Sequence, residues 1–170
     1  QIYSSQGNVD EAIKAYKKAL IIDPNCAEIY NNMGNALNEK GDHKAAINNY
    51  QQAIKIKPNY AEIYCNMGNA QQDSGDLLGA INTYRKSIKI KPDHVEAHSN
   101  MGTALNAAGY YQEAINSHKQ AIKIDHSSYN SYYNMGLIQE ANNNPNEAIE
   151  NFKRVLELDP DNVSAKHILS

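Results

Sequence analysis

The sequence predicts an all-α fold, a stack of antiparallel helix pairs that repeats every 34 residues along the chain. Three observations support this. The tripeptide Asn-Met-Gly returns at a spacing of 34 residues, beginning at Asn32, Asn66, Asn100 and Asn134. The dipeptide Ala-Ile keeps the same spacing, beginning at Ala12, Ala46, Ala80, Ala114 and Ala148. The units end in proline, at Pro24, Pro58, Pro92 and Pro160, with His126 at the one remaining place.

We number the positions of each repeat as slots 1–34, with slot 1 at Ala27. Complete repeats then span 27–60, 61–94, 95–128 and 129–162, within a single array over residues 1–170. Residues 1–26 correspond to the back of an earlier repeat, and 163–170 to the front of a further one. This division predicts about eleven helices, of which the first and the last are incomplete.

Apolar or small residues fill slots 4, 7, 8 and 11 and then slots 20, 24 and 27, which marks one buried stripe on each of two helices. Small residues at slots 8 and 20, such as Gly34 and Ala46, let the two backbones approach closely. The space beside them is filled by an aromatic residue at slot 24, which is Tyr16, Tyr50, Tyr84 or Phe152. We expect a glycine to end the first helix, at Gly41, Gly75 and Gly109, and the proline to end the second.

The bulk composition favours a globular protein domain that works with neither a membrane nor a nucleic acid. The 170 residues are 41% hydrophobic, yet no run approaches the roughly 18 apolar residues of a membrane span. The net charge of −3 gives no reason to expect a polyanionic partner. Only Cys26 and Cys65 occur, without close spacing, so we expect a reducing compartment and a cytoplasmic or nucleocytoplasmic location.

The repeat length, the small residues at slots 8 and 20, the slot 24 aromatic and the slot 32 proline together resemble the tetratricopeptide repeat (TPR) family. The resemblance implies a right-handed superhelical solenoid whose first helices line a concave groove that binds proteins or extended peptides. Two features depart from the family pattern. Slot 4 carries Tyr30, Tyr64, His98 or Tyr132 in place of tryptophan, and slot 11 is polar at Gln71 and Gln139.

In this architecture the groove is expected to be formed by slots 2, 5, 6, 9, 12 and 13 of the first helices, which we call the groove face. Cys65, at slot 5, is expected to lie on this face. The candidate peptide-binding residues are Glu28, Glu62 and Glu96 at slot 2, Tyr133 at slot 5, Asn32, Asn66, Asn100 and Asn134 at slot 6, and Asn35 and Asn69 at slot 9. The face is thus rich in amides and mildly acidic at first, and more apolar near residues 133–141.

The slot 6 asparagines suggest a ladder that holds the backbone of an extended peptide. Each side chain offers a donor and an acceptor together, although asparagine is a poor helix former. The alternative is that these asparagines are structural, or were inherited when the repeat was duplicated. Asparagine also recurs at slot 22 on the outer helix, where no ligand is expected, at Asn48, Asn82 and Asn116.

Consecutive slot 6 asparagines are similar to those of the TPR superhelix of O-linked N-acetylglucosamine transferases, where they help to hold substrate proteins. We therefore expect a scaffold or adaptor for protein–protein interaction. The alternative is the substrate-recognition region of such a glycosyltransferase, whose catalytic domain would lie outside these residues. Self-association through the exposed ends of the stack is a further, weaker hypothesis.

Other kinds of site are disfavoured. A clamp for an acidic C-terminus needs cations on the first helices, and slots 5, 6 and 9 carry none. His94 and His98 have the spacing of two metal ligands, but we interpret them as packing residues and expect no metal. A stripe of lysines, Lys55, Lys57, Lys89, Lys91 and Lys123, is read as a solvated helix edge rather than a phosphate site. No catalytic constellation or cofactor motif is visible, so we do not expect an enzyme.

Overall fold

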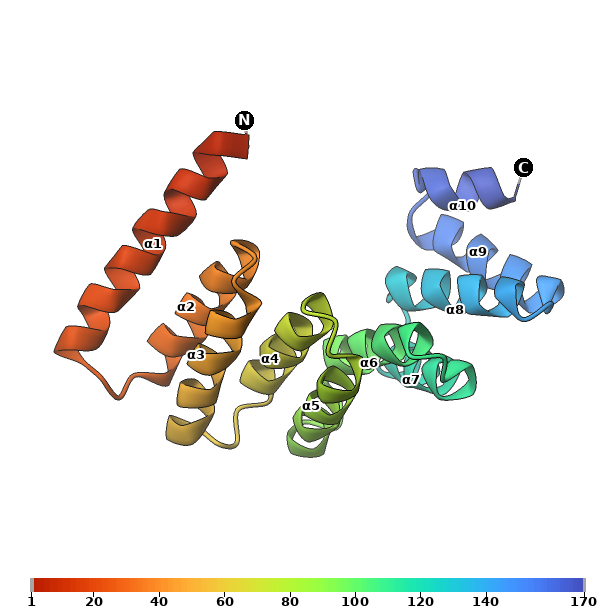
Figure 1. Ribbon diagram of the computed structural model, residues 1–170. Helices are drawn as coiled ribbons and strands as arrows, with labels where there is room; N and C mark the ends of the chain where they lie inside the picture. Colours follow the sequence, from red (N-terminus) through yellow and green to blue (C-terminus); the bar gives the residue numbers. More distant parts are fainter. Residues whose placement is uncertain (1, 170) are drawn as a thin grey trace. The chain divides into compact units, whose positions relative to one another are not determined.

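The computed structural model describes the backbone of residues 2–169 and the side chains of residues 8–169. Over residues 2–169 it contains ten α-helices and no strand (Figure 1). In chain order they are α1 (Ile2–Ile22), α2 (Ala27–Glu39), α3 (His43–Ile56), α4 (Ala61–Asp73), α5 (Leu77–Ile90), α6 (Val95–Ala107), α7 (Tyr111–Ile124), α8 (Tyr129–Ala141), α9 (Pro145–Leu158) and α10 (Val163–Ile168). The all-α prediction is confirmed.

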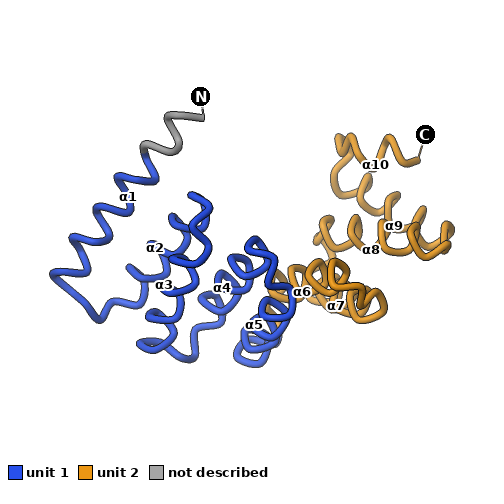
Figure 2. The backbone as a smooth tube through the Cα atoms, viewed as in Figure 1, with its two compact units in different colours: residues 1–92 blue, residues 93–170 orange. Residues whose placement is uncertain are grey.

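The helices fall into two compact units, residues 1–92 and residues 93–170, which are described separately (Figure 2). In unit 1, α2 packs with α3 and α4 packs with α5, each as an antiparallel pair (Figure 1). Helix α1 packs on α2, and α3 packs on α4. The two first helices of this unit, α2 and α4, also contact each other. The groove-face residues of neighbouring repeats therefore lie on adjacent helices.

Unit 2 repeats this arrangement. Helix α6 pairs with α7, α8 pairs with α9, and the short α10 packs on α9. The first helices α6 and α8 contact each other, as α2 and α4 do in unit 1.

The turn inside each helix pair needs a left-handed backbone, and three of the four turns use glycine for it. Gly41 and Gly75 have φ of 86° and Gly109 has φ of 85°, as predicted for the residues that end the first helices. In the fourth repeat Asn143 occupies the same slot with φ of 57°. Asparagine is one of the few residues other than glycine that visits this region routinely. In the first two repeats an aspartate then caps the second helix, since Asp42 accepts from the Ala45 amide and Asp76 from the Gly79 amide.

The close approach predicted for slots 8 and 24 is confirmed in both units. A Cβ atom added at Gly34 would lie 2.6 Å from the ring of Tyr50. One added at Gly136 would lie 2.8 Å from the ring of Phe152. Both rings are almost completely buried, so neither has room to move aside. Glycine at slot 8 is therefore required by the aromatic residue that packs on it.

The expectation of about eleven helices is wrong by one, because residues 2–22 form a single helix, α1, where two were expected. Continuing one helix instead adds a backbone hydrogen bond for each further residue. Among the residues that the structure describes, no helix combines the length and apolar character needed to cross a membrane.

Candidate functional site

The slot 9 asparagines of the first two repeats are tied to the tyrosines that fill slot 24. The hydroxyl of Tyr50 donates a hydrogen bond to Oδ1 of Asn35 at 2.7 Å. The hydroxyl of Tyr84 donates to Oδ1 of Asn69 at the same distance. Burial, and secondarily the charge of Asp73, raises the pKa of Tyr50, so its phenol stays protonated and able to donate. The core thus fixes which way each slot 9 amide points.

The third and fourth repeats carry no tyrosine at slot 24 and no asparagine at slot 9. In the third repeat slot 24 is His118 and slot 9 is Thr103. In the fourth repeat slot 24 is Phe152, which has no hydroxyl, and slot 9 is Leu137. The combination of asparagine at slot 9 with tyrosine at slot 24 is visible in the sequence. Its meaning is clear only from the structure, which shows the two side chains hydrogen-bonded.

The slot 6 asparagines link neighbouring first helices. In unit 1, Nδ2 of Asn66 on α4 donates to Oδ1 of Asn31 on α2 at 3.0 Å. In unit 2, Nδ2 of Asn134 on α8 donates to Oγ1 of Thr103 on α6 at 3.3 Å. Asn100, also at slot 6, is half-buried, whereas Asn32 is exposed. An amide has two donors and two acceptor lone pairs, so one sideways bond leaves most of its capacity unused.

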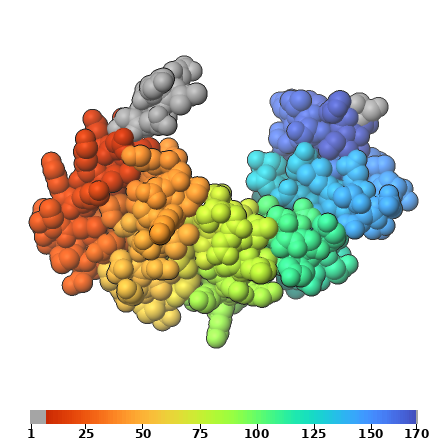
Figure 3. Space-filling view, in the orientation of Figure 1, coloured from red at the N-terminus to blue at the C-terminus, as the bar shows by residue number. Residues whose placement is uncertain are grey.

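An open depression of about 440 Å³ lies between α1 and α2 in unit 1. The described side chains of this unit are coloured from red to yellow-green in Figure 3. Three candidate groove-face slots of the first repeat, 6, 9 and 13, contribute to it. Its walls are Asn8, Val9, Ala12 and Tyr16 from α1 and Asn32, Asn35, Ala36 and Glu39 from α2. The depression therefore combines an apolar floor with amides and one carboxylate.

The slot 2 glutamates Glu28, Glu62 and Glu96 are all exposed in the first turn of their helices. Glu28 is paired within its own repeat, because the Lys57 ammonium donates to its carboxylate. That hydrogen bond lowers the pKa of Glu28 and raises the pKa of Lys57. The Lys57 ammonium therefore partly offsets the negative charge that Glu28 brings to the groove face.

The predicted groove face of the fourth repeat includes two large apolar residues, Tyr133 and Leu137. Tyr133 is half-buried, and its ring meets Phe152 edge to face with the ring centres 5.8 Å apart and an angle of 64°. Leu137, one turn further along α8, is 36% exposed. Phe152 thus supports both a core contact and an apolar patch at the surface.

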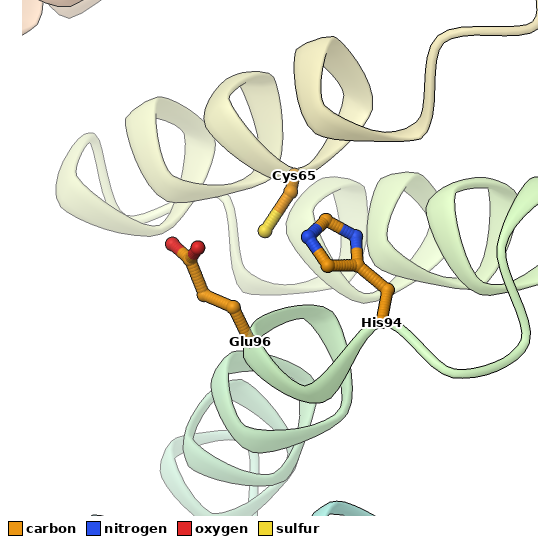
Figure 4. Close-up of side chains that lie close together, drawn as sticks. All are labelled: Cys65, His94 and Glu96. Atoms are coloured by element: carbon orange, nitrogen blue, oxygen red, sulfur yellow. The ribbon is translucent and has the colours of Figure 1, made fainter. Parts of the chain in front are cut away.

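Cys65 was expected to lie open on the groove face, and this is wrong, because only 1% of the residue is exposed. Figure 4 labels Cys65 on helix α4. Within each unit, slot 5 side chains lie between neighbouring first helices rather than in solvent. Asn31 at slot 5 bonds Asn66 of the next first helix, and Ser99 at slot 5 accepts from Ser131 of the next at 3.1 Å.

The histidines at repeat slots behave as packing residues. His98 at slot 4 is buried, and His118 at slot 24 has no exposed surface. Among the described residues, neither ring nitrogen of His118 has a hydrogen-bond partner. Burial lowers the pKa of His118 to about 4, so its ring is neutral at physiological pH.

One of the two polar residues at slot 11, Gln139, has an explanation that sequence reasoning missed. Gln139 is buried, and its Oε1 accepts a hydrogen bond from Nδ2 of Asn151 at 2.6 Å. Asn151 lies at slot 23 on the partner helix α9, so the two amides satisfy each other inside the pair.

Models of the "TPR repeat" match residues 1–41, 34–75, 72–109 and 102–143, and a model of the "Tetratricopeptide repeat" matches residues 129–162. The chain belongs to the tetratricopeptide repeat family. A search of curated protein sequences finds no match.

Several solved TPR proteins share the fold. A crystal structure of MamA is 26% identical with a TM-score of 0.83, over 95% of this chain and 94% of that one. MamA residues 41 to the end from Desulfovibrio magneticus RS-1 are 20% identical with a TM-score of 0.82, over 94% and 90% of the two chains. YrrB, described as a TPR protein with an unusual peptide-binding site, is 22% identical with a TM-score of 0.77, over 98% and 86%.

Proposed function

We propose that this TPR array is a protein-interaction module that binds an extended segment of a partner protein along its groove face. The observation that carries the proposal is the fixed orientation of Asn35, whose Oδ1 accepts from Tyr50. Asn35 is exposed and lines the depression beside α1. The peptide-binding site described for YrrB supports the same class of function for this fold.

The orientation of the slot 9 amide decides what it offers to a ligand. Its carbonyl oxygen faces the tyrosine hydroxyl, so the Nδ2 group is directed to the other side, toward the groove face. The slot 6 amide has the complementary arrangement, because Asn66 uses an Nδ2 hydrogen sideways and keeps its Oδ1 as an acceptor. Donors at slot 9 and acceptors at slot 6 match the carbonyl and amide groups of an extended peptide backbone.

The charged and apolar residues of the groove face indicate which side chains the bound segment should carry. Glu39, Glu62 and Glu96 are exposed there, and slots 5, 6 and 9 carry no cation in the four complete repeats. Tyr133 and Leu137 supply an apolar surface in the fourth repeat. The preferred partner is therefore a neutral or basic segment that carries an apolar residue.

The test replaces Asn35 with Asp. The variant keeps an oxygen that accepts from Tyr50 but exchanges the outward N–H donors for a second acceptor. The probe is a twelve-residue linear peptide selected against the intact protein from a phage-displayed random library. We expect at least a tenfold loss of affinity by calorimetry, with an unchanged urea midpoint. Asn48→Asp on the outer helix α3 is the matched control. Unchanged binding by N35D would remove the groove-face proposal.

The slot 6 ladder is tested separately with the Asn66→Ala/Asn100→Ala double variant and the same peptide. Loss of binding in a protein that still folds would support the ladder. A variant that loses stability while its remaining folded fraction binds normally would show that these asparagines only join the first helices.

The relatives found do not favour the alternative, in which the array selects substrates for a glycosyltransferase. A cytoplasmic or nucleocytoplasmic location, the absence of nucleic-acid binding and self-association through the ends of the stack stay predictions.

A further inference from the structure

A second depression, of about 600 Å³, lies elsewhere in unit 1, between the loop that follows α3 and the helices α4 and α5. Its volume is in the range of small-ligand sites. Its lining residues are Pro58, Asn59, Tyr64, Lys86, Lys89 and Ile90, none of which is a groove-face candidate. The hydroxyl of Tyr64 donates to the carbonyl of Pro58 at 3.0 Å, which ties the loop to α4 and shapes one wall.

All the charged residues that line this depression are positive. Lys86 and Lys89 are exposed, lie three residues apart on α5, and supply two ammonium groups. Among the described side chains, neither lysine has an ion pair. The other lining residues are neutral, so nothing in the wall compensates the two charges.

No other complete repeat has this arrangement at the same two slots, 26 and 29. The first and third repeats carry a glutamine and a single lysine there, Gln52 with Lys55 and Gln120 with Lys123. The fourth carries Arg154 and Glu157, which form an ion pair at 2.6 Å. The guanidinium of Arg154 also lies over the ring of Tyr132, 5.9 Å from its centre. Only the second repeat combines two cations without an anion.

We propose that this depression binds the phosphate group of a phosphorylated residue in a partner protein. A phosphate monoester carries a charge between about −1.5 and −2 at pH 7, which balances two lysines, whereas one carboxylate would leave a cation uncompensated. Each ammonium offers three N–H donors to the phosphate oxygens. Tyr64, Pro58 and Ile90 provide an apolar wall for the side chain that carries the phosphate. The site is separate from the groove face and does not depend on the function proposed for it.

The test is a ¹⁵N–¹H NMR titration of the intact protein with the pentapeptide acetyl-Ala-Ala-phosphoserine-Ala-Ala-amide. The unphosphorylated peptide, the same peptide with glutamate in place of phosphoserine, and inorganic phosphate are titrated in parallel. We expect saturable shifts at residues 58–64 and 86–90 with the phosphopeptide, and weaker ones with the glutamate peptide. Raising the salt concentration should weaken binding, because both lysines are exposed.

Two substitutions copy what other repeats already carry at these slots, so they preserve the fold. Lys86→Gln reproduces the first and third repeats and should weaken phosphopeptide binding about fivefold. Lys89→Glu reproduces the acidic residue of the fourth repeat and should abolish binding. Lys55→Gln in the first repeat is the control and should have no effect.

Three results would overturn the proposal. One is an absence of shifts at residues 58–64 and 86–90. Another is equal affinity of the wild-type protein and the Lys86→Gln variant. The last is equal affinity for inorganic phosphate and the phosphopeptide, which would reassign the site to small phosphate-bearing molecules or to any anion.

Discussion

The hydroxyl of Tyr50, deep in the pair α2–α3, donates a 2.7 Å hydrogen bond to Oδ1 of Asn35 on the groove face. A buried core residue and an exposed candidate binding residue are thus parts of one interaction. The fourth repeat carries an apolar residue at each of these two slots, with Phe152 in the core and Leu137 at the surface.

Replacing Tyr50 with Phe should lower the free energy of unfolding by about 1 kcal/mol, the usual net value of one hydrogen bond. The double variant Tyr50→Phe/Asn35→Leu copies the pair of the fourth repeat, so it should recover part of that loss. Urea unfolding of the wild type, both single variants and the double variant gives the coupling energy, which we expect to be about 1 kcal/mol. A coupling energy near zero would show that the two residues do not act as a pair.

Replacing Gly34 with Ala should destabilise the protein, because the new Cβ would lie 2.6 Å from the buried ring of Tyr50. Overpacking a tight core costs roughly 1–3 kcal/mol, and the better helix propensity of alanine offsets up to about 1 kcal/mol of it. A net loss of about 1–2 kcal/mol should appear in urea unfolding. Asn48→Ala, on the exposed face of α3, is the control and should change stability by less than about 0.5 kcal/mol. Equal stabilities of the two variants would argue against the close packing.

Much of the architecture was predictable because a fixed period of 34 residues makes each slot visible several times. Gly41 and Gly75 were assigned to turns correctly, and the structure shows the left-handed backbone that requires them. Gly34 was assigned to a close helix contact, which the ring of Tyr50 confirms. These features depend on local backbone geometry and on packing inside one helix pair, and both are repeated in the sequence.

The features that were not predicted depend on which residues contact each other in three dimensions, and the repeat pattern alone does not specify these contacts. Cys65 was placed on the groove face by its spacing, but the residue is buried. The break expected near the start of the chain is absent, since α1 is continuous. The pairing of slots 9 and 24 could have been found by comparing those two columns across the four repeats, with Asn beside Tyr twice and Leu beside Phe once.

Acid should destabilise the protein through His118. Its pKa falls from an ordinary value of 6.5 to about 4 on burial, so the folded state binds a proton less readily than the unfolded chain. Protonation of His118 does not affect the free energy of unfolding above pH 6.5. As the pH falls from 6.5 toward 4, the free energy of unfolding decreases by about 3 kcal/mol in all. His118→Phe places the fourth repeat's slot 24 residue in the third repeat. The difference in unfolding free energy between this variant and the wild type should grow in that pH interval, and a constant difference would contradict the prediction.

Replacing Asn151 with Leu should leave Oε1 of Gln139 buried without its 2.6 Å hydrogen bond. An unsatisfied buried polar group costs about 1–3 kcal/mol, which thermal or urea unfolding can measure. Adding Gln139→Leu removes the second polar group, so the double variant should be more stable than the Asn151→Leu variant alone. A double variant that is less stable than that single variant would show that the amide pair contributes through its shape rather than through its hydrogen bond.

The link between Tyr50 and Asn35 also limits how this array can diverge or be redesigned. An isolated exchange at slot 9 to a residue that cannot accept a hydrogen bond leaves a phenol in the interior without its acceptor. An isolated exchange of the slot 24 tyrosine releases the surface amide from its fixed orientation. A change to an apolar surface at this position therefore requires two coordinated substitutions, 15 residues apart in sequence. The ligand preference of a repeat thus depends partly on a buried residue. Grafting only the surface residues of one repeat onto another would leave out the core residue that orients the slot 9 side chain.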